Sequence, residues 1–249
     1  MHALVLQRGR ASIAELAEAF DVSEMTVRRD LELLESQGLA RRVVGGAIAT
    51  SSRSYEPPFA SRALQATDAK LAIAEAAATY VDFGETAILD VGSTALELAR
   101  VLRGRAGLTV VTPNIRAAVE LANEPNTRVV LCGGEVRPGE LSLIGDGPER
   151  TFAGLNCDVL FLGVGGVHPE RGFTEYNLDD ARIKRAALAA SLRCVALADA
   201  SKLERICLAT VAPITAADVL ISDAPATHPV LEAAREAGVE VVSVNQPEA

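Results

Sequence analysis

The sequence predicts an α/β protein in which a small N-terminal winged helix-turn-helix precedes a larger domain with a mostly parallel, doubly wound sheet. Two patterns predict the first part: a pair of short helices joined by a tight turn, and then a basic segment broken by two glycines. A third predicts the second part, because continuous apolar runs alternate with helical patterns from residue 87 onward. We expect the winged helix-turn-helix at residues 1–50, a linker at 51–64 and the α/β domain at 65–249.

The first helix of the pair is predicted to begin at a capping box. Ser12 and Glu15 have the spacing at which each side chain accepts a hydrogen bond from the other residue's backbone N–H. Apolar residues then recur at helical spacing, which predicts one buried face formed by Ile13, Leu16, Ala17 and Phe20.

The second helix is predicted to follow a turn at Asp21 and Val22. Ser23 is a suitable N-cap, and Glu24 is favoured beside the positive end of the helix. The buried stripe is expected to comprise Val27, Leu31 and Leu34, whereas Met25, Arg28, Arg29 and Glu32 fall on the opposite side. A helix whose doubly basic face stays free is what a helix-turn-helix presents to the major groove of DNA.

Residues 39–48 predict a β-hairpin beside this helix, which would form the wing of a winged helix and bring arginines to DNA phosphates. The surface expected to bind double-stranded DNA comprises Ala11, Ser12, Ser23, Glu24, Met25, Thr26, Arg28, Arg29, Asp30, Arg41, Arg42, Gly45 and Gly46. The alternative is an ordinary helical pair whose arginines are merely solvated.

Composition and charge restrict the class of protein. No apolar run approaches membrane-spanning length and no signal-peptide pattern is present, so we expect a cytoplasmic protein without membrane contact. Four isolated cysteines (Cys132, Cys157, Cys194 and Cys207) predict reduced core thiols, and we expect neither a metal nor a cofactor. The net charge of −9 lies beyond residue 62, because residues 1–62 hold eight arginines and eight acidic residues. The local field of the paired arginines, rather than the total charge, would attract DNA.

The larger part opens with an alanine-rich helical pattern at residues 70–80. Strands are expected at residues 87–91, 108–112, 128–132, 158–164, 194–198, 219–222 and 239–244. Because ligands of such folds bind at the carboxyl ends of strands, the loops there are candidate binding segments. In one of them Gly92, Ser93 and Thr94 lead into a helix, whose N-terminus suits a phosphate group.

The N-terminal motifs resemble those of the DeoR family of bacterial sugar-operon repressors. The pattern Leu-Ala-x-x-Phe-x-Val-Ser-x-x-Thr-Val-Arg-Arg-Asp-Leu occupies residues 16–31, and Gly-Gly-Ala follows at 45–47. Two departures from the family are visible. Val44 stands where the family usually has a histidine, and about one helical turn fewer precedes the first motif, so we expect a short first helix.

The resemblance extends through the second part, which is similar to the DeoR sensor domain. It implies a fold like that of ribose-5-phosphate isomerase and the sensing of a phosphorylated sugar. Asp90, Gly92, Ser93 and Thr94 match the family's phosphate loop, and Asn114 matches its Thr-Asn element with Pro113 inserted. Further effector-binding positions implied by the resemblance are Gly133, Gly134, Gly163, Lys184, Asp199 and Lys202.

Two rival functions remain open at this point. A sugar-phosphate isomerase-like enzyme with an accessory N-terminal domain would need a base and an electrophile, for which Asp199, Lys202 and Glu175 are candidates. A protein-interaction scaffold would leave both the arginine helix and the strand-end loops unexplained. The preferred interpretation is a DNA-binding repressor of a carbohydrate operon, acting as a homodimer or homotetramer because one winged helix reads few bases.

Overall fold

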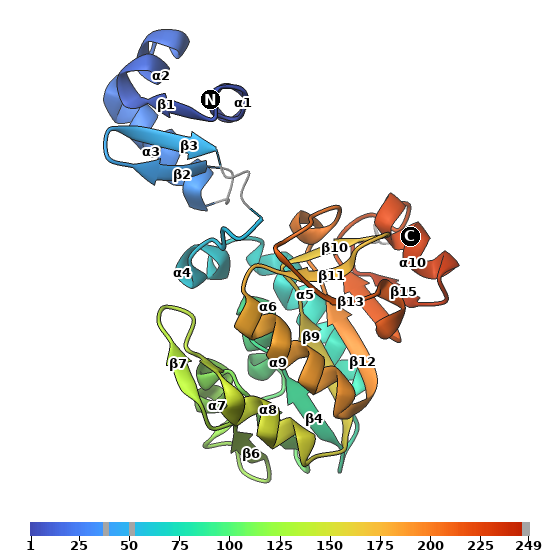
Figure 1. Ribbon diagram of the computed structural model, residues 1–249. Coiled ribbons are helices and arrows are strands. Elements are labelled where there is room, and N and C mark those ends of the chain that lie inside the picture. The colour runs from blue at the N-terminus through green and yellow to red at the C-terminus, as the bar shows by residue number, and fades with distance from the viewer. Residues whose placement is uncertain (37–39, 50–52, 246–249) are drawn as a thin grey trace. The chain divides into compact units, whose positions relative to one another are not determined.

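The computed structural model describes residues 1–36, 40–49 and 53–245, and these form two compact units, Met1–Gln65 and Ala66–Ala249 (Figure 1). Each unit has its own hydrophobic core. Residues 50–52, where the expected linker begins, lie outside the described residues.

The N-terminal unit is a helix-turn-helix packed on a small antiparallel sheet. Its elements are α1 (His2–Arg8), β1 (Arg10–Ser12), α2 (Ile13–Phe20), α3 (Glu24–Ser36), β2 (Ala40–Val43), β3 (Gly46–Ala49) and α4 (Phe59–Ala63). Strands β2 and β3 form the expected hairpin, and β1 pairs with β3 to give the order β1-β3-β2. The sequence had not indicated β1, because three residues are too few to show an alternating pattern.

The core of this unit contains most of the predicted apolar stripe. Leu16, Val27 and Leu31 are fully buried, together with Ala40 and Ala47 from the hairpin. Phe20 was expected in the same face, but its side chain is 41% exposed. It is the last residue of α2, and the chain turns away at Asp21, whose φ of 51° lies in the left-handed region. Phe20 therefore extends past the layer that buries Leu16.

The second unit is built on a parallel sheet of seven strands within the described residues. The strand order is β15-β14-β12-β9-β4-β5-β6, and each neighbouring pair is parallel. The strands are β4 (Thr86–Leu89), β5 (Thr109–Thr112), β6 (Arg128–Leu131), β9 (Cys157–Gly163), β12 (Ser191–Leu197), β14 (Val219–Ser222) and β15 (Glu240–Ser243). All seven overlap the runs predicted from the sequence.

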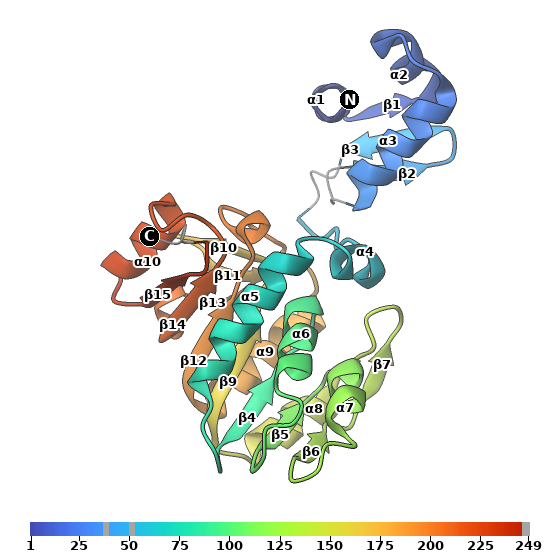
Figure 2. The same ribbon diagram turned by 180° about the vertical axis from the view of Figure 1, so that it is seen from behind.

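Helices cover both faces of this sheet. One face carries α5 (Thr67–Ala77), extended by η1 (Ala78–Tyr80), with α6 (Ser93–Val101) and α7 (Ile115–Leu121) (Figure 2). The other carries α8 (Asp146–Ala153), α9 (Leu178–Ala189) and α10 (Pro229–Glu236). Successive strand residues alternate between the two cores: Ile88 and Leu160 contact the second set, whereas Leu89 and Phe161 contact the first. The doubly wound α/β architecture is confirmed.

Short strands at the edges complete the second unit. β7 (Glu135–Arg137) and β8 (Ser142–Ile144) form a hairpin, and β10 (Gly166–His168), β11 (Gly172–Glu175) and β13 (Ala209–Ala212) form an antiparallel sheet. Two single helical turns, η2 (Ala200–Lys202) and η3 (Ile214–Ala216), follow β12 and β13. No helix in the described part of the chain is long and apolar enough to span a membrane. The four cysteines are buried free thiols.

Candidate functional site

The exposed face of α3 carries the two adjacent arginines. Arg28 forms an ion pair of 3.4 Å with Glu24, one turn earlier on the helix. Arg29 is exposed and has no hydrogen-bond or ion-pair partner among the described residues. Met25 on the same surface is 63% exposed. Because Val27 and Leu31 are buried on the opposite side, α3 presents both arginines to solvent.

Both helices of the motif begin at satisfied caps. The Ser12 N–H donates to Glu15 Oε2 (2.6 Å) and the Glu15 N–H donates to Ser12 Oγ (3.2 Å), which is the predicted capping box. The hydrogen bonds from Ser12 lower the pKa of Glu15 below its usual value. Ser23 Oγ accepts from the Thr26 N–H at 3.2 Å and lies 3.0 Å from Thr26 Oγ1. The cap side chains thus bond locally.

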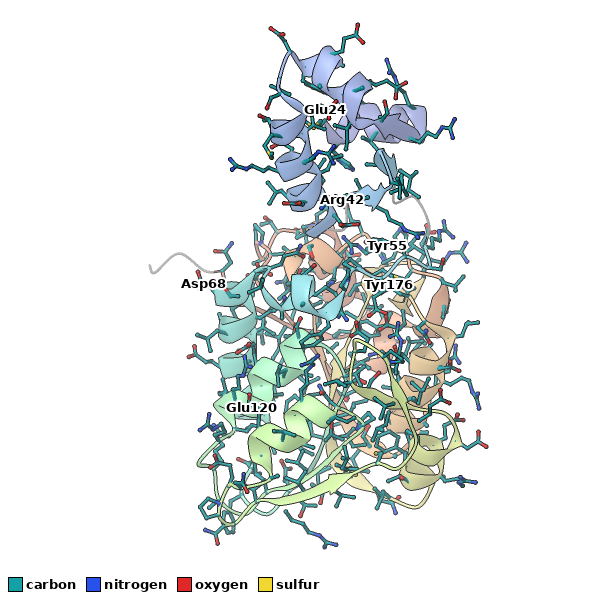
Figure 3. All side chains as sticks on the ribbon, turned by 90° about the vertical axis from the view of Figure 1, so that its left-hand side faces the viewer. Glu24, Arg42, Tyr55, Asp68, Glu120 and Tyr176 are labelled. Atoms are coloured by element: carbon teal, nitrogen blue, oxygen red, sulfur yellow. The ribbon has the colours of Figure 1, made fainter. Side chains whose placement is uncertain are left out.

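The wing holds one free and one bound arginine. Arg41 is exposed and has no hydrogen-bond or ion-pair partner among the described residues. Arg42, labelled in Figure 3, pairs with Glu32 of α3 at 2.8 Å, and its N–H donates to Glu35 Oε1 at 2.9 Å. Arg42 therefore fastens the wing to α3.

Three other predicted DNA-facing positions shape the wing in different ways. Ala11 is buried, and so is Gly46, where an added Cβ would come within 2.3 Å of the Ala11 carbonyl oxygen. Gly45 has a φ of +82° at the turn, next to the fully exposed Val44. The glycines are therefore required for the hairpin itself, and Val44 forms its tip.

The five candidate loops of the second unit lie along one edge of the sheet. They follow β12, β9, β4, β5 and β6, which are consecutive neighbours in the strand order. Because parallel strands end at the same edge, Asp90, Asn114, Gly133, Gly163 and Asp199 are brought to one side of the unit.

The loop after β4 leads directly into α6. Gly92 has a φ of +107°, a conformation that favours glycine, and Ser93 is the first residue of the helix. The Leu96 N–H donates to the Gly92 carbonyl at 3.2 Å. The N–H groups of Ser93, Thr94 and Ala95 therefore precede the first intrahelical bond, and the positive end of the helix dipole lies there. Ser93 is buried and Thr94 is half-buried.

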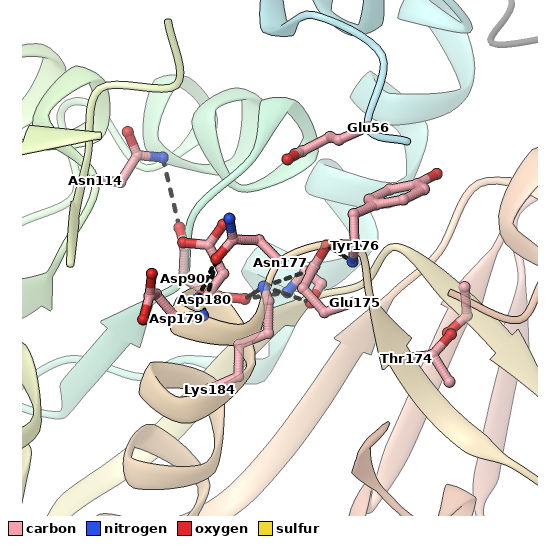
Figure 4. Close-up of polar contacts among 12 residues, drawn as sticks. Glu56, Asp90, Asn114, Thr174, Glu175, Tyr176, Asn177, Asp179, Asp180 and Lys184 are labelled. Carbon is pink, nitrogen blue, oxygen red and sulfur yellow. Dashed lines mark hydrogen bonds and ion pairs between the residues drawn. The ribbon is translucent and has the colours of Figure 1, made fainter. Parts of the chain in front are cut away.

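A buried charged cluster supports this loop from α9. Lys184 Nζ donates to the Asp90 carboxylate and to the Gly163 carbonyl (3.0 Å), and it lies 3.4 Å from Glu175 Oε2 (Figure 4). Asp90 Oδ2 also accepts the Gly163 N–H at 3.0 Å. Burial alone lowers the pKa of Lys184, but Asp90 and Glu175 outweigh it and raise the pKa above its usual value. Lys184 is therefore charged, and its charge is offset within the protein.

Asn114 remains beside Asp90 although a proline precedes it. Its Oδ1 accepts the N–H groups of Arg116 (3.1 Å) and Ala117 (3.2 Å), so Asn114 caps α7. Its Nδ2 donates to the Asp90 carbonyl at 3.5 Å. The inserted Pro113 extends the chain from β5 into this cap without separating the two residues.

The other predicted effector positions differ in their surroundings. Gly134 has a φ of +146°, and an added Cβ would lie 2.6 Å from the Ile144 carbonyl oxygen, whereas Gly133 is open to solvent. Asp199 is buried and accepts hydrogen bonds from the Ser201 N–H (3.0 Å) and hydroxyl. Lys202 ends the helical turn that Asp199 caps and is half-buried.

Comparisons with known proteins agree with this two-part organisation. A family model described as the DeoR-like helix-turn-helix domain matches residues 1–53, and the DeoR C terminal sensor domain matches residues 65–224. Over part of the chain the fold overlaps a solved ribose 5-phosphate isomerase A of Methanocaldococcus jannaschii. That overlap has a TM-score of 0.42 at 19% identity, covering 55% of this chain and 54% of that one.

Curated relatives match along nearly their whole length. The HTH-type transcriptional regulator GolR of Listeria innocua is 34% identical over 96% of this chain and 94% of its own. The regulator GlpR of Haloferax volcanii is 34% identical over 96% of this chain and 93% of its own. The glycerol-3-phosphate regulon repressor of Escherichia coli K12 is 33% identical over 89% of this chain and 88% of its own. These relatives are named as regulators, which favours the regulator over the isomerase-like alternative. The chain belongs to the DeoR family and is a DNA-binding transcriptional regulator.

Proposed function

We propose that the chain represses an operon of sugar or carbohydrate metabolism and that a phosphorylated sugar controls its binding to DNA. The observation that carries the proposal is the start of α6, where the Gly92 loop leaves the N–H groups of Ser93, Thr94 and Ala95 without intrahelical partners. Such a helix start binds phosphate through its N–H groups and its dipole. The name of one relative, the glycerol-3-phosphate regulon repressor, supports a small phosphorylated effector.

The charge around α6 sets the conditions for binding an anion there. The second unit is strongly acidic, so a phosphate is held only where local positive potential exceeds the background. Lys184 neutralises part of the nearby carboxylate charge, and the helix start contributes the direct N–H donors. Lys184 thus acts through Asp90 in this proposal, and not as a ligand of the phosphate.

On the DNA side, the proposed contacts differ among the four arginines. Arg29 and Arg41 are available for bases or phosphates at no internal cost, because neither has a partner among the described residues. Arg28 must give up its ion pair with Glu24 to bind DNA, but this exposed pair contributes little to stability. Arg42 keeps the wing against α3 through Glu32 and Glu35. A symmetric homodimer or homotetramer would place two or more such surfaces on a palindromic operator.

The test combines a ligand screen with operator binding. Full-length protein is screened against phosphorylated sugars and polyols by thermal shift, and each compound that raises the melting temperature is then added to an operator complex. The operator is obtained by selection from genomic fragments. We expect at least one phosphorylated compound both to stabilise the protein and to release the DNA. Failure of every such compound, with release by an unphosphorylated sugar instead, contradicts the proposal.

A further inference from the structure

The hairpin of β7 and β8 belongs to a closed series of contacts, a ring, that begins and ends at Asp90 just after β4. Asn114 donates to the Asp90 carbonyl and forms an isolated antiparallel bridge with Ser142 of β8. Ser142 is in turn the register partner of Arg137 in β7. Arg137 pairs with Asp180 in the first turn of α9, and Lys184, one turn later, returns to Asp90. The ring thus joins the hairpin to the loop that leads into α6.

The register places the ring's side chains on one face. Residues directly opposite each other in antiparallel pairing project to the same side. Asn114 is opposite Ser142, and Ser142 is opposite Arg137, so the three side chains share a face. Asn114 and Arg137 use that face to reach Asp90 and Asp180. By this register Ser142, between them, projects to the same side as Asn114 and Arg137.

Among the residues that the structure describes, none forms a hydrogen bond with the hydroxyl of Ser142. Ser142 is only 2% exposed, and its Oγ is buried and unsatisfied. Buried hydroxyls in folded proteins are nearly always bonded, and an unpaired one costs free energy. Two neighbouring ring members, Asn114 and Lys184, are fully engaged in caps and ion pairs. The unmet hydroxyl therefore belongs to Ser142 and not to these two residues.

We propose that Ser142 Oγ binds a hydroxyl group of the effector whose phosphate is bound at the start of α6. A serine hydroxyl both donates and accepts, which matches a sugar or polyol hydroxyl. Asp90 precedes Gly92 by two residues, so the Asn114–Asp90 bond joins this position to the phosphate loop. Arg137 acts as a positioning residue, since its ion pair with Asp180 holds the hairpin against α9. This inference rests on the proposed function and adds to it a residue that contacts a hydroxyl group of the effector.

The test uses the full chain, glycerol 3-phosphate and a set of hexose 6-phosphates, with propyl phosphate as a ligand that has no hydroxyl. Ser142→Ala should weaken binding of the responding polyol or sugar phosphate by about 3–10-fold, the loss of one neutral hydrogen bond. Its affinity for propyl phosphate should equal that of the wild type. Its ligand-free melting temperature should not fall, because the variant removes an unpaired buried hydroxyl. Val136→Ala, on the exposed side of the same hairpin, is the matched control.

Each outcome decides between the two proposals. If no phosphorylated compound binds the wild type, the proposed function fails and this inference fails with it. If the wild type responds and Ser142→Ala binds the responding compound equally well, the assignment of Ser142 alone is wrong. A fall in the ligand-free melting temperature of Ser142→Ala, or an equal loss of propyl phosphate binding, also overturns it, since either shows that the hydroxyl supports the fold or the phosphate.

Discussion

Lys184 on α9 donates a hydrogen bond to Asp90 at the end of β4, 94 residues away in the sequence, and both side chains are at most 2% exposed. This pair links a helix on one face of the sheet to the loop that starts α6 on the other. It also means that the buried lysine serves the loop's conformation. The sequence had placed both residues in the effector site, but it gave no indication that they bind each other.

Removing the lysine should destabilise the second unit strongly. Lys184→Met leaves Asp90 and Glu175 buried without their cation, and we expect the free energy of unfolding to fall by about 3–5 kcal/mol. Chemical denaturation followed by circular dichroism measures the loss. Arg182→Ala is the control on the same helix: its ion pair with Glu149 is 2.7 Å long but half-exposed, so about 0.2–1 kcal/mol is expected. Equal effects of the two variants would contradict the structural role of Lys184.

The recognition helix should lose operator affinity when its free arginine is removed. Arg29→Ala is expected to cost about 1–3 kcal/mol of operator binding, and the double variant Arg28→Ala/Arg29→Ala more, because arginine bonds to guanine edges or phosphates are lost. Fluorescence anisotropy with a selected operator measures this. Operator binding by the double variant at wild-type affinity would rule out α3 as the recognition helix.

The two wing arginines should differ in their effects. Arg41→Ala should weaken binding evenly across sequences and reduce the salt dependence by about one counterion, as expected of a phosphate contact. Arg42→Ala should instead loosen the hairpin, because it removes the side-chain ion pair with Glu32, although the backbone N–H bond to Glu35 is kept. Hydrogen exchange of the β2 and β3 amides distinguishes them: faster exchange is expected for Arg42→Ala and not for Arg41→Ala. Faster exchange in Arg41→Ala and not in Arg42→Ala would contradict the phosphate contact assigned to Arg41 and the structural role assigned to Arg42.

The buried thiols should be inert and should make stability fall in alkali. Burial raises the pKa of Cys132 and of Cys207 to about 11, above the usual value of a thiol. Since the unfolded chain ionises first, the stability that these thiols contribute is complete below the unfolded pKa and is lost between about pH 9 and pH 11. Native protein should therefore resist iodoacetamide at about pH 8 and react after unfolding. Rapid alkylation of native protein, or a Cys132→Ala/Cys207→Ala variant with the same alkaline loss of stability, would contradict this.

The sequence was sufficient for the parts of the fold that repeat a pattern. Runs such as residues 87–91 are apolar at every position because they lie in a sheet covered on both faces, and Val27 and Leu31 recur at helical spacing. It was insufficient for β1, β7 and β8. Each of these strands has three residues, which pair through backbone hydrogen bonds and are too few to show an alternating pattern. The exposure of Phe20 depends on where α2 ends, which spacing alone does not determine.

The candidate effector site shows the same division. Strand-end loops are visible in the sequence, and the structure places them along one edge of the sheet. Arg137 and Ser142 were missed because they reach that edge on a hairpin that returns from beyond β6, and their position depends on its register with Asn114. In the sequence, the pair Gly133-Gly134 a few residues before Arg137 is the local feature that could have directed attention to this hairpin. Pairings between distant segments, such as Asp90 with Lys184, follow from topology and not from composition.

The effector response of Thr94→Asp tests most directly whether a phosphorylated sugar that binds at the start of α6 controls DNA binding. The substitution puts a carboxylate at the start of α6 where the effector's phosphate would bind, and an acidic residue in the first turn is compatible with the helix. Operator affinity is measured with and without the responding sugar phosphate, and each variant is compared with its own ligand-free value. We expect wild type and Thr94→Ser to lose affinity by about 5–150-fold on adding effector, and Thr94→Asp to show no change. A normal response by folded Thr94→Asp would place the effector site elsewhere and contradict the account.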